Sequence, residues 1–298
     1  MMGLAHHFSP TKVLTMTQAQ KAARLLELHH SDVPLVLVNA WDAASACIVA
    51  STGFPAIASS SAAVANALGY ADGQRVPWSA MAEAIRRIAD AVSLPVTADI
   101  EAGFSLTSQG LEWNIEQVIE AGAVGINLED ALPNHGEFGP LYPLPEQTNR
   151  IARVRALAQK RKLHLVINAR TDAYWQTGVS PDEALSNTLD RGKAYLQAGA
   201  DCVFVPGLKS PDHIRTIASE LRGPLNVLAF PGVAPVAELA KLGVKRISLG
   251  SGPMRVAMGA LRRLAEEVQT SGTYRGLGEG AVTYVEMNAF FEKPAPKG

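Results

Sequence analysis

Four carboxylates stand at the ends of two apolar segments that read as consecutive β-strands. Asp99 and Glu101 follow the first segment, and Glu129 and Asp130 end the second. Burying even one unpaired carboxylate costs several kcal/mol, so the four acids together predict a bound cation. Oxygen ligands favour a hard divalent ion, and we expect Mg²⁺, with Mn²⁺ as the alternative. Taken singly, each acid could instead cap the next helix or face solvent.

Two further groups suit a small anionic substrate. Arg170 follows another apolar run and offers a planar, two-pronged donor for a carboxylate or phosphonate, whereas Asp172 could do no more than orient it. The N–H groups of the turn Ser60, Ser61, Ala62 could hold a second carboxylate or an oxyanion, or the turn could be ordinary polar surface. Together with the metal, these groups suit a 2-oxo acid whose enolate forms when a neighbouring bond breaks.

Composition narrows the class of protein. The chain has 298 residues, a formal net charge of −1 and 18% charged residues, which argues against a nucleic-acid groove. Cys47 and Cys202 lie in apolar runs without metal-ligand spacing, so we expect core thiols in a reducing compartment. No apolar stretch has the length of a membrane helix and the start lacks a signal-peptide core, which predicts a soluble, cytoplasmic protein.

A βα pattern repeats along the chain and would position these residues. The predicted strands span residues 35–39, 56–59, 96–99, 125–128, 165–169, 202–205, 226–229 and 246–249. Gly122, Gly199 and Gly243 supply a left-handed helix end just before three of them. Eight such units predict a closed (β/α)8 TIM barrel with its active site at the carboxyl ends of the strands. The absence of GxGxxG after the first strand disfavours a dinucleotide-binding fold.

The remaining segments have simpler roles. Residues 17–28 predict a helix that caps one end of the fold, Asp42 is expected to be a helix N-cap, and Ser180 is expected to begin another helix. Residues 1–298 are predicted to form one domain. Its segment 254–298 ends in an apolar face that must pack on something, made of Val282, Tyr284, Val285, Ala289 and Phe290.

At these residues the sequence resembles the isocitrate lyase/phosphoenolpyruvate mutase superfamily. The matching stretches are 39–46, 68–72, 98–104, 127–130 and 168–173, in the order of that family. The resemblance implies a (β/α)8 barrel whose eighth helix is exchanged between subunits, giving homodimers that often pair into homotetramers. It also implies Mg²⁺ held directly by Asp99, with Asp72, Glu101 and Glu129 acting mainly through metal-bound water. By the same resemblance, Ser60, Ser61 and Ala62 hold the substrate carboxylate, and Arg170 binds the substrate.

One loop departs from the family's patterns. Residues 131–142 lack the catalytic cysteine of the isocitrate and methylisocitrate lyases and the lysines of the phosphoenolpyruvate mutases. His135 or Tyr142 on this loop could protonate an enolate. We therefore expect a Mg²⁺-dependent lyase of a small 2-oxo or 2-hydroxy acid, of the oxaloacetate decarboxylase type. The alternatives are a mutase or hydrolase acting on a C–P bond and a non-catalytic 2-oxo acid binder.

Overall fold

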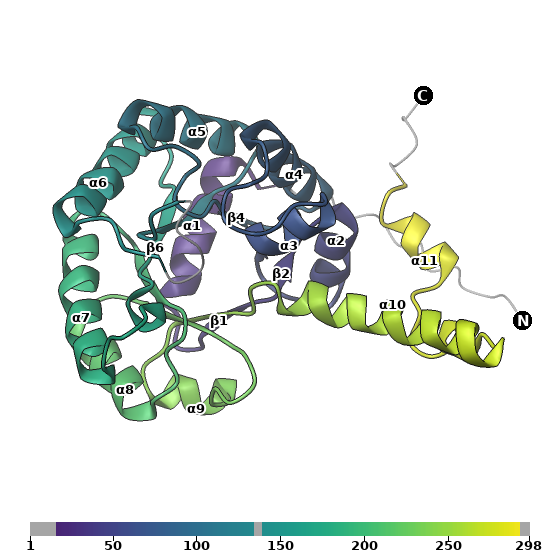
Figure 1. Cartoon of the computed structure of the whole chain (residues 1–298). Helices are drawn as coiled ribbons and strands as arrows, with labels where there is room; N and C mark the ends of the chain where they lie inside the picture. Colours follow the sequence, from purple (N-terminus) through teal and green to yellow (C-terminus); the bar gives the residue numbers. More distant parts are fainter. Residues whose placement is uncertain (1–15, 134–138, 293–298) are drawn as a thin grey trace, which may run out of the picture.

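The computed structural model describes residues 16–133 and 139–292, and its parallel strands form one continuous sheet (Figure 1). The strands are β1 (Leu35–Leu37), β2 (Asn39–Ala40), β3 (Ile57–Ser59), β4 (Val96–Asp99), β5 (Gly125–Glu129), β6 (Val166–Arg170), β7 (Cys202–Val205), β8 (Leu225–Leu228) and β9 (Arg246–Ser248). Strand β1 pairs with β9, whereas β2 pairs with β3. Because only Val38 separates β1 from β2, the two edges of the sheet meet. The predicted eight-stranded barrel is confirmed, with its first strand split in two.

Helices form a ring around most of the barrel, and every strand except β1 is followed by at least one helix (Figure 1). They are α1 (Gln18–His29), α2 (Ala43–Ser51), α3 (Ser61–Ala67), α4 (Trp78–Ala91), α5 (Ser108–Glu120), α6 (Leu144–Lys160), α7 (Pro181–Gln197), α8 (Pro211–Glu220), α9 (Val236–Lys241), α10 (Gly252–Ser271) and α11 (Tyr284–Ala289), with short 3₁₀ turns η1 (Ala173–Trp175) and η2 (Arg275–Leu277). The ends of the strands differ from the predicted ones by a residue or two at most, as hydrogen-bond geometry commonly allows.

The predicted helix signals are borne out locally. Asp42 Oδ1 accepts a hydrogen bond from Ser45 N at 2.7 Å, which makes Asp42 the N-cap of α2. Ser180 caps α7 in the same way and is followed by proline at the first helical position. Gly122, Gly199 and Gly243 all have positive φ, between 90° and 105°, where a side chain would be strained.

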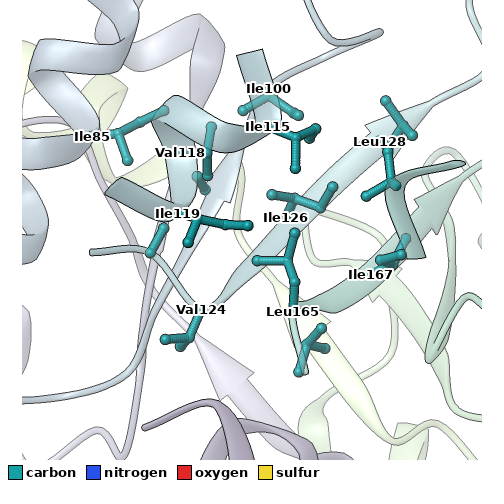
Figure 2. Close-up of a cluster of buried hydrophobic side chains, with 14 of the residues drawn as sticks. Ile85, Ile100, Ile115, Val118, Ile119, Val124, Ile126, Leu128, Leu165 and Ile167 are labelled. Atoms are coloured by element: carbon teal, nitrogen blue, oxygen red, sulfur yellow. The ribbon is translucent and has the colours of Figure 1, made fainter. Parts of the chain in front are cut away.

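Successive side chains of each strand point alternately outward to the helices and inward to the barrel interior. In β5, Ile126 and Leu128 point outward and pack with Ile115 and Val118 of α5, as Figure 2 shows. Asn127 and Glu129 occupy the alternate positions and therefore point into the barrel. The same alternation applies in β4 and β6. The strand pattern thus delivers polar side chains to the barrel interior while its apolar residues build the core.

Helix α1 covers the end of the barrel where the strands begin. Gln18 Nε2 donates to Ile119 O and Ala123 O, just before β5, and confirms the predicted capping role. His29 Nε2 lies 3.2 Å from Nη1 of the fully buried Arg246. Burial, followed by the charge of Arg246, lowers the pKa of His29 to about 3, so this imidazole is neutral and can accept from the guanidinium.

Helix α10 extends away from the ring of helices as an arm, and α11 follows it through the turn η2 (Figure 1). This arm carries large apolar side chains in solvent, including Val256 at 72% exposure, Leu261 at 58% and Val285 at 77%. Of the helices in residues 16–133 and 139–292, none combines the length and apolarity needed to cross a bilayer.

Candidate active site

The acids predicted from the strand ends gather at the carboxyl end of β4 and β5. Asp99 is the last residue of β4, and its Oδ2 accepts hydrogen bonds from Ser61 N at 3.0 Å and Ser61 Oγ at 2.8 Å. Its backbone N–H donates to Ser59 Oγ at 2.9 Å. Asp99 Oδ1 is buried and has no hydrogen-bond partner among the described residues. Such an oxygen is a site where a ligand is expected.

The serine-rich turn at the start of α3 serves Asp99 first. Ser60 N donates to Ala40 O, and Ser61 N donates to Asp99, so these two N–H groups are not free for a substrate. The prediction that the N–H groups of Ser60 and Ser61 hold a substrate anion is wrong, because these groups already donate to the neighbouring strand and to the carboxylate of Asp99. The N–H of Ala62, in the first turn of α3, has no acceptor within the described part of the chain.

Glu101 and Asp72 lie on the same side of the site. Glu101 has a positive φ of 49° and is buried, and Gln74, just after Asp72, donates a backbone hydrogen bond to its carboxylate. Burial, with the charges of Asp72 and Asp99, raises the pKa of Glu101 to about 8. Asp72 is exposed and accepts from Gly73 N at 3.0 Å. Asp72 and Asp99 therefore act electrostatically on Glu101, and Glu101 and Asp99 act on Glu129.

Arg170 connects this cluster to β6. Its Nε and Nη2 donate to the two oxygens of Asp172 at 2.6 and 2.9 Å, and its Nη1 lies 2.8 Å from Glu129 Oε2 as an ion pair without hydrogen-bond alignment. Burial opposes the charge of Arg170, but Asp172 and Glu129 raise its pKa well above the usual value. Asp172 therefore orients Arg170, which is the role that the sequence suggested for it. N–H hydrogens on both terminal nitrogens remain for a substrate anion.

Asp130 has a structural role. Its Oδ2 accepts from Tyr195 Oη at 2.7 Å and Arg191 Nη1 at 3.1 Å, and its Oδ1 accepts from Asp172 N at 2.9 Å. Both oxygens are therefore satisfied by helix α7 and the turn after β6. The expectation that all four strand-end acids share a cation is wrong for Asp130, because these protein donors already hold it.

The two predicted proton donors differ in what the structure says of them. His135 lies outside the described residues. The Tyr142 ring packs under Arg150 of α6, whose Cζ is 4.4 Å from the ring centroid, and burial raises the pKa of Tyr142. These contacts favour a packing role for Tyr142.

The residues present fit a divalent cation that keeps most of its bound waters. Among the described residues, no three His, Cys, Asp or Glu side chains converge as direct ligands of one ion. The site instead has two buried carboxylate oxygens without a hydrogen bond, Asp99 Oδ1 and Glu129 Oε2, of which the second has only the ion pair to Arg170. Glu101 is close enough to raise the pKa of Glu129. Mg²⁺ retains several waters and commonly uses one or two carboxylates, so Asp99 would hold it and the other acids would hold its waters.

The raised pKa of Glu101 makes the stability of the metal-free protein depend on pH. The pKa of Glu101 is about 8 in the folded protein and 4.5 in the unfolded chain. The folding stability that Glu101 contributes is therefore fully present below pH 4.5 and is lost as the pH rises through 8. Glu101→Gln mimics the neutral acid and is expected to unfold about 5 °C higher than the wild type at pH 9 but at a similar temperature at pH 4.5. Thermal unfolding in EDTA across this range measures the difference.

Comparing the two proteins at each pH cancels the opposite contribution of His29, whose low pKa removes stability as the pH falls. Unfolding curves that stay parallel from pH 4.5 to 9 would contradict the assignment of a buried, protonated Glu101.

The chain is similar to known proteins over most of its length. An uncharacterized protein of Mycobacterium tuberculosis (strain H37Rv) is 33% identical over 81% of this chain and 87% of its own. A solved phosphonomutase-like protein from Burkholderia cenocepacia is 41% identical, with a TM-score of 0.79 over 83% of this chain and 99% of its own. A 2-methylisocitrate lyase of Halalkalibacterium halodurans is 27% identical over 86% of this chain and 85% of its own.

The phosphoenolpyruvate phosphomutase family model matches residues 25–269, which include every strand of the barrel and every acid of the site. The chain is also similar to relatives named as lyases and as a mutase. The chain therefore belongs to the phosphoenolpyruvate phosphomutase family.

Proposed function

We propose that this protein is a Mg²⁺-dependent lyase that cleaves a C–C bond of, or decarboxylates, a small 2-oxo or 2-hydroxy acid through an enolate. The observation that carries the proposal is the unpartnered Asp99 Oδ1, buried beside Glu101 and Glu129 and facing the same site as Arg170. A cation bound there would supply Lewis-acid stabilisation of negative charge on the substrate's carbonyl oxygen. An oxaloacetate decarboxylase-type reaction fits these groups.

The chain's own residues divide the remaining work. Ser61 orients Asp99 through two hydrogen bonds, so its other oxygen keeps a defined direction. Arg170 receives one substrate carboxylate, since Asp172 fixes its guanidinium in a bidentate contact. The Ala62 N–H and the hydroxyl of Ser60 would hold a second carboxylate, because the hydroxyl hydrogen of Ser61 already donates to Asp99. His135 is our proposal for the proton donor.

Turnover of a substrate panel tests the proposal. Oxaloacetate is the first substrate of the panel. Its turnover is measured as the rate of pyruvate formation, once with Mg²⁺ and once with EDTA. Turnover that requires Mg²⁺ would support a lyase. Tight Mg²⁺-dependent ligand binding with no turnover of any member would favour a non-catalytic 2-oxo acid binder instead.

A C–P bond enzyme is the second candidate, because the matching family model describes a phosphomutase. Phosphorus NMR after incubation with phosphonopyruvate distinguishes the two reactions. New phosphorus signals would favour the mutase or hydrolase, whereas an unchanged spectrum with active oxaloacetate turnover would favour the lyase. The loop's lack of lysines disfavours phosphoryl chemistry, which needs cations near the phosphoryl oxygens.

We also propose that the enzyme is a homodimer or homotetramer in which α10 and α11 pack on a neighbouring subunit. The exposed apolar side chains of this arm, including Val256, Leu261 and Tyr284, would be covered in such an assembly. Sedimentation of Leu261→Asp should show smaller particles than the wild type. A monomeric wild type would contradict the assembly.

A further inference from the structure

The guanidinium of Arg170 is restrained at its edge by ion pairs and at its faces by aromatic rings. Asp172 and Glu129 contact the edge, at distances between 2.6 and 2.9 Å. Arg170 Cζ lies 4.8 Å from the ring centroid of Trp175 and 5.8 Å from that of Phe204. Edge contacts alone fix where the group sits but restrain its tilt weakly. Stacked rings restrain the tilt, and a planar guanidinium stacks well on an indole.

Trp175 reaches this position because the chain turns sharply after β6. The 3₁₀ turn η1 is closed by a hydrogen bond from Trp175 N to Asp172 O at 2.9 Å. Asp172 therefore holds Arg170 with its carboxylate and holds the backbone of Trp175 with its carbonyl. One residue therefore holds both the guanidinium and the backbone that carries the indole.

The indole of Trp175 also packs closely against the turn after β7. Gly207 has a φ of 80°, and a Cβ built there would lie 2.7 Å from Cδ1 and Nε1 of Trp175. Only glycine leaves room for the ring at this point. Residues on either side of Trp175 are anchored as well, because Tyr174 Oη lies 2.8 Å from His213 Nδ1 and Gln176 Nε2 donates to Gly139 O at 2.8 Å.

We propose that Trp175 is a positioning residue that sets the plane of Arg170 for recognition of the substrate carboxylate. Two parallel N–H···O bonds to a carboxylate require the two planar groups to be nearly coplanar. Without the indole, Arg170 would keep its ion pairs but sample more tilts, and binding would have to restrict them. The inference rests on the proposed role of Arg170. It extends that role to a residue that does not itself bind the metal or donate a proton.

The first test does not depend on the substrate. In the ligand-free protein, the NMR signal of Arg170 Nε–H should be displaced by the ring currents of Trp175 and Phe204. Trp175→Leu is expected to move this signal toward the position usual for arginine and to speed its hydrogen exchange about tenfold. Trp113→Leu, in which an indole 60% exposed on α5 is removed, is the matched control and should leave the signal unchanged. An unchanged Arg170 signal in Trp175→Leu would overturn the proposal.

The second test measures recognition of oxalate, an analogue of the pyruvate enolate, by calorimetry in saturating Mg²⁺. We expect Trp175→Leu to bind about tenfold more weakly and Trp175→Phe, which keeps a smaller aromatic face, to lie between it and the wild type. With a turned-over substrate, KM should rise more than kcat falls. If Trp175→Leu does not fold, Trp175→Phe carries both tests. Wild-type affinity in both variants would overturn the positioning role.

The two proposals fail separately. A wild-type protein that binds no oxalate with Mg²⁺ would contradict the proposed function, while the NMR comparison in ligand-free protein still decides whether Trp175 orients Arg170. A protein that binds oxalate normally in all Trp175 variants would leave the function supported and the positioning role refuted.

Discussion

Replacing Asp99 with alanine is expected to lower Mg²⁺-dependent turnover about a thousandfold, since Lewis-acid stabilisation supplies several kcal/mol of the barrier. Asp99 carries the buried oxygen that lacks a partner, and no other carboxylate of the cluster has the same hydrogen bonds from Ser61. Steady-state kinetics and calorimetric titration with Mg²⁺ would measure the losses of turnover and metal affinity together.

Two variants separate this loss from damage to the fold. Asp99→Asn keeps an oxygen for Ser61 but loses the negative charge, and should be nearly as inactive as the alanine variant. Asp90→Ala removes an exposed carboxylate on α4 that pairs with Arg86, and should keep normal turnover. Full activity in Asp99→Ala would refute the metal-dependent site.

Arg170→Lys is expected to raise KM about a hundredfold even though the positive charge is retained. A lysine ammonium cannot make the planar fork to Asp172 while also facing Glu129 and a substrate carboxylate. The loss should appear mainly in substrate affinity, because Asp99 and Glu101 are untouched. Steady-state kinetics with saturating Mg²⁺ would separate KM from kcat.

The matched control for this exchange is Arg87→Lys, which alters an exposed arginine on α4 that pairs with Glu83. Its kinetics should match the wild type. An Arg170→Lys enzyme with unchanged KM would mean that the substrate carboxylate is held elsewhere, for example by the turn at Ala62.

Much of the fold could be predicted from the sequence because the signals are local and repeated. Apolar runs, N-cap residues and helix-ending glycines recur in each βα unit, and each acts through its own backbone. The split of the first strand at Val38 was not predicted. That break depends on β1 and β2 pairing with opposite edges of the sheet, which is a contact between distant parts of the chain.

The candidate site was predicted less completely than the fold. Acids at strand ends have a recognisable position, so the sequence predicts that Asp99, Glu101 and Glu129 lie near one another, as they do in the structure. Whether an acid is free or satisfied depends on partners far along the chain, and Asp130 is satisfied by Arg191 and Tyr195 on α7. Trp175 was missed because an aromatic residue after a strand usually belongs to the core, and its contact with Arg170 depends on Gly207.

The most direct measurement of the central claim is a calorimetric titration with oxalate, once with Mg²⁺ and once with EDTA. The proposed site predicts strong binding with Mg²⁺ and none with EDTA, because Asp99 would hold the cation that stabilises the negative charge of oxalate, and Arg170 would receive its carboxylate. Binding in neither condition would contradict the account and would mean that this barrel has the family's form without a site for an enolate.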